Sequence, residues 1–93
     1  MEVGQYNKAI DYLEKALELS KEIGDKSHEG HWFGNLGIVY MSLEQYDKAI
    51  GEYEKAVEIS KKRGNMSGEE TWIGKLDNAY SKLGQNKADS KCK

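Results

Sequence analysis

The chain has 93 residues, of which 32% are charged and 38% hydrophobic, and its net charge at pH 7 is −2. This length allows one small domain with a modest core, and interleaved acids and bases argue against a nucleic-acid-binding protein, which needs a basic stripe to neutralise phosphates. The absence of proline favours an all-helical fold.

The first predicted helix covers residues 5–23. Gly24 and Asp25 after it form a stop-and-turn signal, and Ser27 can cap the next helix. Apolar or small side chains recur in this helix at the three- and four-residue spacing of an amphipathic helix, namely Tyr6, Ala9, Ile10, Leu13, Ala16, Leu17 and Ser20.

The second predicted helix covers residues 27–42 and contains Gly34 and Gly37. A glycine in a helix interior costs about 1 kcal/mol relative to alanine, so the pair needs an explanation. Residues three and four apart share a helix face, which places Gly37 among large side chains. A glycine there lets a neighbouring helix approach closely, and we interpret Gly37 as a packing residue. The large side chains are Phe33, Leu36 and Tyr40.

The third and fourth predicted helices, residues 45–63 and 67–83, repeat the first two after forty residues. The fourth differs in having Asp77 at the place of Gly37, so we expect that face to meet water, as in a solubilising cap. Residues 85–93 are expected to form a disordered tail. The repeat is seen in pairs such as Tyr6/Tyr46, Ala9/Ala49, Ala16/Ala56, Ser20/Ser60, Gly24/Gly64, Trp32/Trp72, Gly34/Gly74 and Tyr40/Tyr80.

The pattern of one complete period resembles the tetratricopeptide repeat, which has an aromatic residue, Leu-Gly and Tyr on its first helix and Ala, an aromatic residue and Ala on its second. The matching residues are Phe33, Leu36, Gly37, Tyr40, Ala49, Tyr53 and Ala56. The longer period, with EIGD and GNLG, is similar to the subclass in Leu-Gly-Asn-repeat modulators of G-protein signalling.

This resemblance implies an all-α fold, an αα-superhelix of four antiparallel helices. It also implies a single domain over residues 1–84. Within it, residues 3–24 are a half repeat, 27–63 a complete repeat, and 67–83 a half repeat or capping helix.

The resemblance further implies a non-enzymatic scaffold that binds a peptide segment of a partner protein on a concave face lined by the first helices. Gly34 and Gly74 are expected to leave backbone accessible for close approach of the peptide. Carried over position by position, the peptide-binding residues are His31, Asn35, Ile38 and Met41 in the complete repeat and Thr71, Lys75, Asn78 and Lys82 in the last helix.

An alternative function is self-association. The first helix lacks an obvious covering helix, so we expect an exposed apolar strip that mediates homodimerisation. The strip comprises Tyr6, Ile10, Leu13 and Leu17.

Motifs for catalysis or metal binding are weak. The segment HEGH, from His28 to His31, is one residue shorter than the H-E-x-x-H motif of metalloproteases. Asp25 with these two histidines would make at best an adventitious site. Phosphate-binding loops and nucleophile elbows are missing from the sequence, so we expect no enzyme activity, metal or cofactor.

The sequence also lacks signals for secretion or membrane insertion. Its start has neither the basic region nor the apolar stretch of a signal peptide, and its longest apolar run, residues 38–41, is too short to cross a bilayer. The single cysteine, Cys92, cannot form an internal disulfide. We therefore expect a cytoplasmic protein that binds neither membranes nor nucleic acid.

Overall fold

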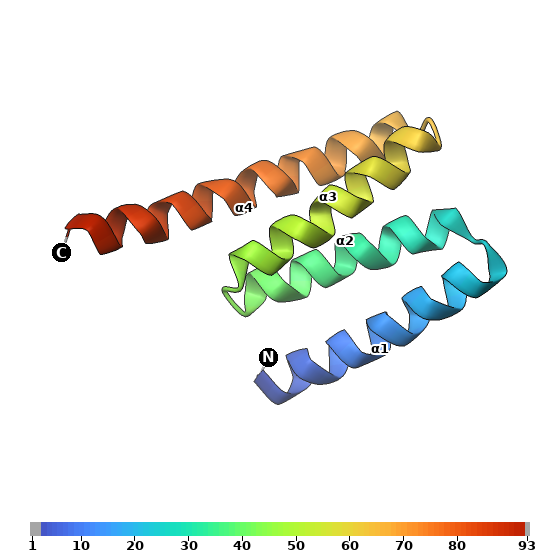
Figure 1. The fold of residues 1–93 in the computed structure, drawn as a ribbon, viewed down its shortest axis with the longest axis horizontal. Helices are drawn as coiled ribbons and strands as arrows, with labels where there is room; N and C mark the ends of the chain where they lie inside the picture. The colour runs from blue at the N-terminus through green and yellow to red at the C-terminus, as the bar shows by residue number, and fades with distance from the viewer. Residues whose placement is uncertain (1–2, 93) are drawn as a thin grey trace.

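The computed structural model describes the backbone of residues 3–92 and the side chains of residues 4–84. This part of the chain forms four helices, α1 (Val3–Ile23), α2 (Lys26–Ser42), α3 (Tyr46–Lys62) and α4 (Met66–Cys92). Each helix runs antiparallel to the one before it, and the helices lie side by side in chain order (Figure 1). The predicted all-α fold is confirmed.

The three turns between the helices share one geometry. Gly24, Glu44 and Gly64 follow each other at intervals of twenty residues, and each has a positive φ, of 71°, 59° and 70° respectively. The next residue donates its backbone N–H to a carbonyl in the last helical turn; for example, Asp25 bonds to Ser20 at 2.8 Å. This is the Schellman arrangement, which ends a helix by satisfying its free carbonyl groups.

The start of α2 differs from the prediction. Its N-cap is Asp25, whose Oδ1 accepts a hydrogen bond from the backbone N–H of His28 at 3.2 Å, whereas Ser27 already lies inside the helix. Asn65, forty residues later, caps α4 in the same way, by accepting from the N–H of Gly68 at 3.0 Å. Asp25, and not Ser27, therefore accepts a hydrogen bond from one of the free backbone N–H groups at the start of α2.

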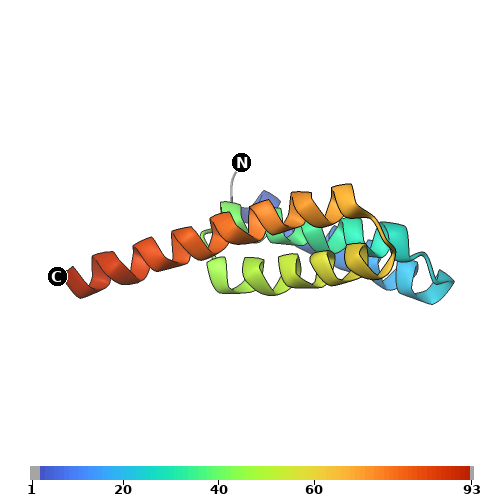
Figure 2. The ribbon, with the colours of Figure 1, turned by 90° about the horizontal axis from the view of Figure 1, so that it is seen from above.

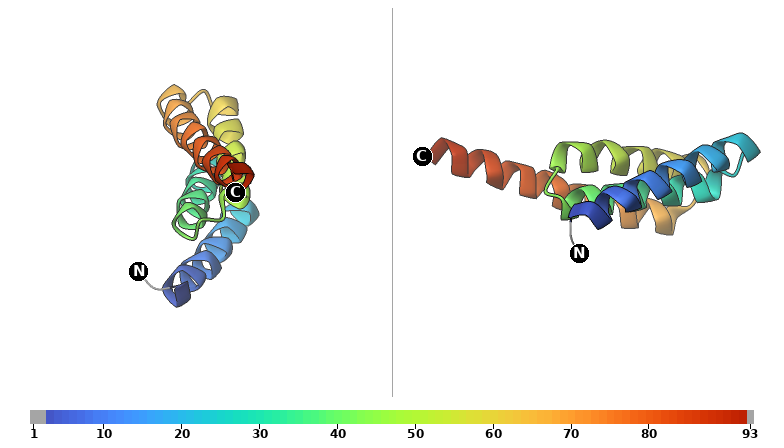
Figure 3. Two further views of the ribbon diagram at one scale, coloured as in Figure 1. Left: turned by 90° about the vertical axis from the view of Figure 1, so that its left-hand side faces the viewer. Right: turned by 90° about the horizontal axis from the view of Figure 1, so that it is seen from below.

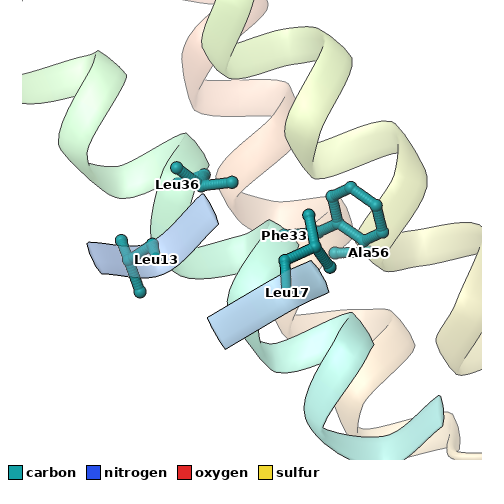
Figure 4. Packing of buried hydrophobic residues seen from close by; sticks show 5 residues of the cluster. All are labelled: Leu13, Leu17, Phe33, Leu36 and Ala56. Atoms are coloured by element: carbon teal, nitrogen blue, oxygen red, sulfur yellow. The ribbon is translucent and has the colours of Figure 1, made fainter. Parts of the chain in front are cut away.

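The core consists of two connected clusters. The first joins α1, α2 and α3 through Leu13, Leu17, Phe33, Leu36 and Ala56 (Figure 4). The half-buried side chains of Tyr40 and Trp72 pack against both clusters and link them. The second cluster joins α3 to α4 and comprises Ala49, Ile50, Tyr53 and Ala79.

Gly37 has the packing role that the sequence suggested. It is buried, and a Cβ built on it would lie 2.5 Å from Cε1 of Tyr53 on α3. Tyr53 is flanked along its helix by Ala49 and Ala56, both fully buried. The small residues therefore let α2 and α3 approach closely while the phenol ring fills the space between them.

The prediction that Tyr6, Ile10, Leu13 and Leu17 form an exposed strip on α1 is wrong. Leu13 and Leu17 are each only 9% exposed because α2 covers that face of the helix, and Tyr6 and Ile10 are half-buried. The apolar side chains that α1 does expose are Tyr12 (73%), Leu19 and Ile23.

The last helix is longer than predicted. The prediction ended it at residue 83 and placed a disordered tail at 85–93, but α4 continues through Gly84 to Cys92; Lys93 lies outside the described residues. Its C-terminal part projects beyond the other helices (Figures 2 and 3). The segment after Gly84 contains neither proline nor β-branched residues, and one internal glycine costs only about 1 kcal/mol.

Helices able to cross a membrane are not found between residues 3 and 92, because none there combines sufficient length with sufficient apolar character.

Candidate functional site

The eight predicted peptide-binding residues lie on α2 and α4, with different degrees of exposure. Asn35, Met41 and Lys75 are half-buried, and Met41 packs against the second core cluster, so part of its role is structural. The exposed members of the set are His31, Ile38, Thr71, Asn78 and Lys82.

The helices α2 and α4 meet at Gly34, which corrects one prediction. Gly34 was expected to leave backbone accessible for a peptide, but it is buried. A Cβ placed on it would overlap the indole ring of Trp72. Gly34 therefore serves the contact between α2 and α4, whereas its counterpart Gly74 is exposed and has open space around it.

A cavity of about 490 Å³ opens where the N-terminal parts of α2 and α4 meet the C-terminal part of α3. Such a volume lies within the range of ligand sites in proteins. The cavity brings together two of the predicted residues, His31 and Thr71. The cavity is also lined by residues that were not predicted as site residues. These are Trp32 on α2, Ser60 on α3, Arg63 directly after α3, and Trp72 on α4.

The two tryptophans occupy equivalent repeat positions but differ in their contacts. The indole Nε1–H of Trp32 donates to the hydroxyl of Ser20 at 3.0 Å. Trp72 instead stacks on Tyr53, with ring centroids 6.2 Å apart and planes 23° apart. The indole ring of Trp72 lies over Gly34. Within the described part of the chain, the indole N–H of Trp72 does not donate a hydrogen bond to Ser60 as that of Trp32 does to Ser20.

The cavity rim carries one arginine and two histidines, and the carboxylate of Asp25 lies beside one of these histidines. His28, His31 and Arg63 line the cavity. Nδ1 of His28 lies 2.6 Å from Oδ2 of Asp25. The backbone N–H of His28 and then its imidazole hold the pKa of the Asp25 carboxyl below its ordinary value, and the positive charge of Arg63 acts in the same direction.

The second acidic group near the start of α2 is also engaged. Glu29 is buried, and its Oε2 lies 3.2 Å from Nζ of Lys26, one turn away on the same helix. Removal of a carboxylate from water is costly unless a cation compensates it. The carboxylate of Asp25 is therefore engaged by His28, whereas Glu29 has the Lys26 ammonium nearby but its Oε2 has no hydrogen-bond partner within the described part of the chain.

The forty-residue repeat held a signal for this cavity. Ser20 and Trp32 recur as Ser60 and Trp72, so two residue types that can hydrogen-bond to each other are conserved between the two periods of this chain. Arg63 could not be found in this way because its equivalent in the first period is Ile23.

The family model described as tetratricopeptide repeat matches residues 1–62, which is more than half of the chain. This range ends with the last residue of α3. No curated protein matches the chain significantly.

Proposed function

Because this chain belongs to the tetratricopeptide repeat family, we propose that it is a protein-interaction module that binds a peptide segment of a partner along α2 and α4. The observation that carries this proposal is the direct contact between α2 and α4 at Gly34 and Trp72. This contact brings the two helices with the predicted binding positions next to each other.

The side chains on these helices suit a peptide main chain. Asn35 and Asn78 each carry an amide, which both donates and accepts hydrogen bonds and so matches the N–H and C=O groups of a peptide. Lys75 supplies a cation for an acidic side chain, and the exposed Ile38 supplies apolar contact. Such recognition needs neither a catalytic group nor a cofactor.

The test is a comparison of peptide affinities. Peptides are selected from a random library on the wild-type chain, and their Kd values are measured by calorimetry. Asn35→Ala with Lys75→Ala is expected to weaken binding about ten-fold, because each lost hydrogen bond contributes about 0.5–1.5 kcal/mol.

The matched control is Asn7→Ala with Lys8→Ala, which removes the same two residue types from exposed positions on α1. It should leave the affinity unchanged. Equal losses in the two double variants, or no loss in either, would contradict binding along α2 and α4.

We also propose that the repeats belong to the forty-residue subclass similar to Leu-Gly-Asn-repeat modulators and that the protein acts in the cytoplasm. The regular turns at Gly24, Glu44 and Gly64 support the longer period, since each helix with its turn takes twenty residues.

A second candidate function is self-association through α1. Three exposed apolar side chains favour it: Tyr12, Leu19 and Ile23. Their spacings of seven and four residues place them on one face of the helix. We propose that this stripe, rather than the predicted one, would form a contact between two copies.

A further inference from the structure

We infer that α4 of one copy docks on the exposed face of α1 of a second copy, so that copies join head to tail. This inference rests on the proposed self-association and names the surface that covers the α1 stripe of Tyr12, Leu19 and Ile23. The forty-residue repeat makes α1 the equivalent of α3, and α4 the equivalent of α2. Docking of α4 on α1 therefore repeats, between copies, the contact that α2 makes with α3 inside each copy.

Pairs of neighbouring residues on α2 and α3 give the pattern of this contact. The pairs are Gly30 with Ile59, Phe33 with Lys55, Gly37 with Tyr53, and Tyr40 with Lys48. A Cβ built on either glycine would lie 3.0 Å or 2.5 Å from its partner, and the lysine Nζ atoms lie 5.2 Å and 5.7 Å from the ring centroids. The corresponding pairs between two copies are Glu70 with Leu19, Ile73 with Lys15, Asp77 with Leu13, and Tyr80 with Lys8.

The face of α1 that receives α4 is open in the single molecule. On α3, the small residues Ala49 and Ala56 are fully buried. Their equivalents on α1, Ala9 and Ala16, are only half-buried, and Leu19 is 58% exposed. Small residues on a helix let a second helix approach closely, as they do between α2 and α3, so this face of α1 has room for another helix.

One pair of the pattern changes in size on both sides. Inside each copy, Gly37 has no side chain, and the ring of Tyr53 occupies the space beside it. Between copies, Asp77 stands at the place of Gly37 and Leu13 at that of Tyr53. Leucine lacks the aromatic carbon Cε1, with which a side chain at the glycine position would collide. The smaller residue on α1 therefore leaves room for the larger one on α4.

The two faces also carry opposite charges. The glycine places of α2 are filled on α4 by Glu70 and Asp77, whereas α1 keeps both lysines of the pattern, Lys8 and Lys15. All four side chains are exposed in the single molecule. Asp77 lies one helical turn from each of the residues that pair with these lysines, so its carboxylate comes between the two ammonium groups. Complementary charges select the partner and fix the register of a contact, and here they identify a second copy as the occupant.

The test blocks each face in turn, with light scattering as the measurement. Because two different faces meet, the contact does not close on itself, and the mass of the wild type should grow past the dimer as concentration rises. Leu19→Glu brings a second carboxylate opposite Glu70, and Ile73→Lys brings a second ammonium group opposite Lys15. Each variant alone should be monomeric. Their equimolar mixture should form a dimer and nothing larger, because each variant keeps the face that the other has lost.

Matched variants control for added charge and for folding. Asn7→Glu on α1 and Asn78→Lys on α4 add the same charges at exposed positions outside the paired sets, and both should associate like the wild type. Tyr80→Lys, which faces Lys8, is a second block of the α4 face and should behave as Ile73→Lys does. Asp77→Asn should weaken association about two- to five-fold, because it removes a charge from between two lysines. Circular dichroism checks that each variant is folded.

A contact between two α1 stripes gives a different result. Ile73→Lys alone then dimerises, Leu19→Glu stays monomeric, and the mixture contains no mixed dimer. This result overturns head-to-tail docking but leaves the proposed self-association intact. A mixture that stays monomeric, or an Asn78→Lys variant that blocks association as strongly as Ile73→Lys, also overturns the docking. A wild-type chain that is monomeric at every concentration excludes the self-association itself.

Discussion

At the scale of single residues, glycine has different roles at equivalent positions. Gly34 is buried under the indole of Trp72, and Gly37 is buried against the ring of Tyr53. Gly74, forty residues after Gly34, has no atom of a neighbouring element within 4 Å of where its Cβ would be. The cost of a glycine in a helix is thus offset by close packing at the first two positions but not at the third.

This difference predicts opposite effects of one substitution. Gly34→Ala is expected to lower the free energy of unfolding by about 1–3 kcal/mol, because the added methyl group displaces Trp72 from its stack on Tyr53. Gly74→Ala is expected to raise it by about 0.5–1 kcal/mol, because alanine favours the helix and meets no obstacle.

Urea denaturation followed by circular dichroism measures both effects, and tryptophan fluorescence in the folded state reports the displacement of Trp72. A stabilisation of similar size in both variants would show that Trp72 moves at no cost and that Gly34 is not required for packing.

At the scale of the elements, the helices are separated by one type of turn used three times. Gly24 and Gly64 have the positive φ that glycine adopts without strain, but the middle turn places Glu44 at φ 59°. A residue with a side chain costs about 1–2 kcal/mol in this conformation. The hydrogen bonds that end α2 therefore form in spite of local strain.

The turns accordingly should respond differently to substitution. Gly64→Ala is expected to lower the free energy of unfolding by about 1–2 kcal/mol. Glu44→Gly is expected to raise it by less than about 1 kcal/mol, since relief of strain is partly offset by the greater freedom of glycine in the unfolded chain. Chemical denaturation of the two variants beside the wild type tests this, and a marked loss of stability in Glu44→Gly would contradict it.

At the scale of the whole molecule, the helices form an open row in which the outer helices are less covered than the inner ones. α2 and α3 each pack against a helix on either side, whereas α1 packs mainly on α2, and α4 mainly on α3 (Figure 1). The outer face of α1 consequently carries the exposed stripe of Tyr12, Leu19 and Ile23.

Self-association through this stripe predicts a mass that depends on protein concentration. Light scattering at several concentrations should show the wild type growing above the monomer mass, and Leu19→Glu should keep it monomeric, because a buried charge without a partner is unfavourable. Met66→Glu, at an exposed apolar position on α4, is the control and should behave like the wild type. A wild-type chain that stays monomeric at every concentration and keeps its helicity on dilution would exclude this function.

Prediction of the candidate site from the sequence was only partly successful. The predicted peptide-binding positions on α2 and α4 could be chosen because they follow the repeat pattern. Two of them, His31 and Thr71, line the same cavity in the structure. Ser60 repeats Ser20, so the forty-residue period held a signal for it, but Arg63 corresponds to Ile23 in the first period. The approach of this end of α3 to α2 depends on tertiary packing. Gly34 was misread for the same reason, since its contact is with a side chain on another helix.

The sequence by itself determined the helices, their order and the role of Gly37, because periodicity, helix caps and a forty-residue repeat are local or repeated signals. The first three helices begin and end within two residues of their predicted bounds. Only the tertiary structure decided which face of α1 is covered, that Trp72 lies over Gly34, and which groups surround the cavity. Those features depend on how helices pack across long separations in the chain, and packing is set by the shapes of both partners at once.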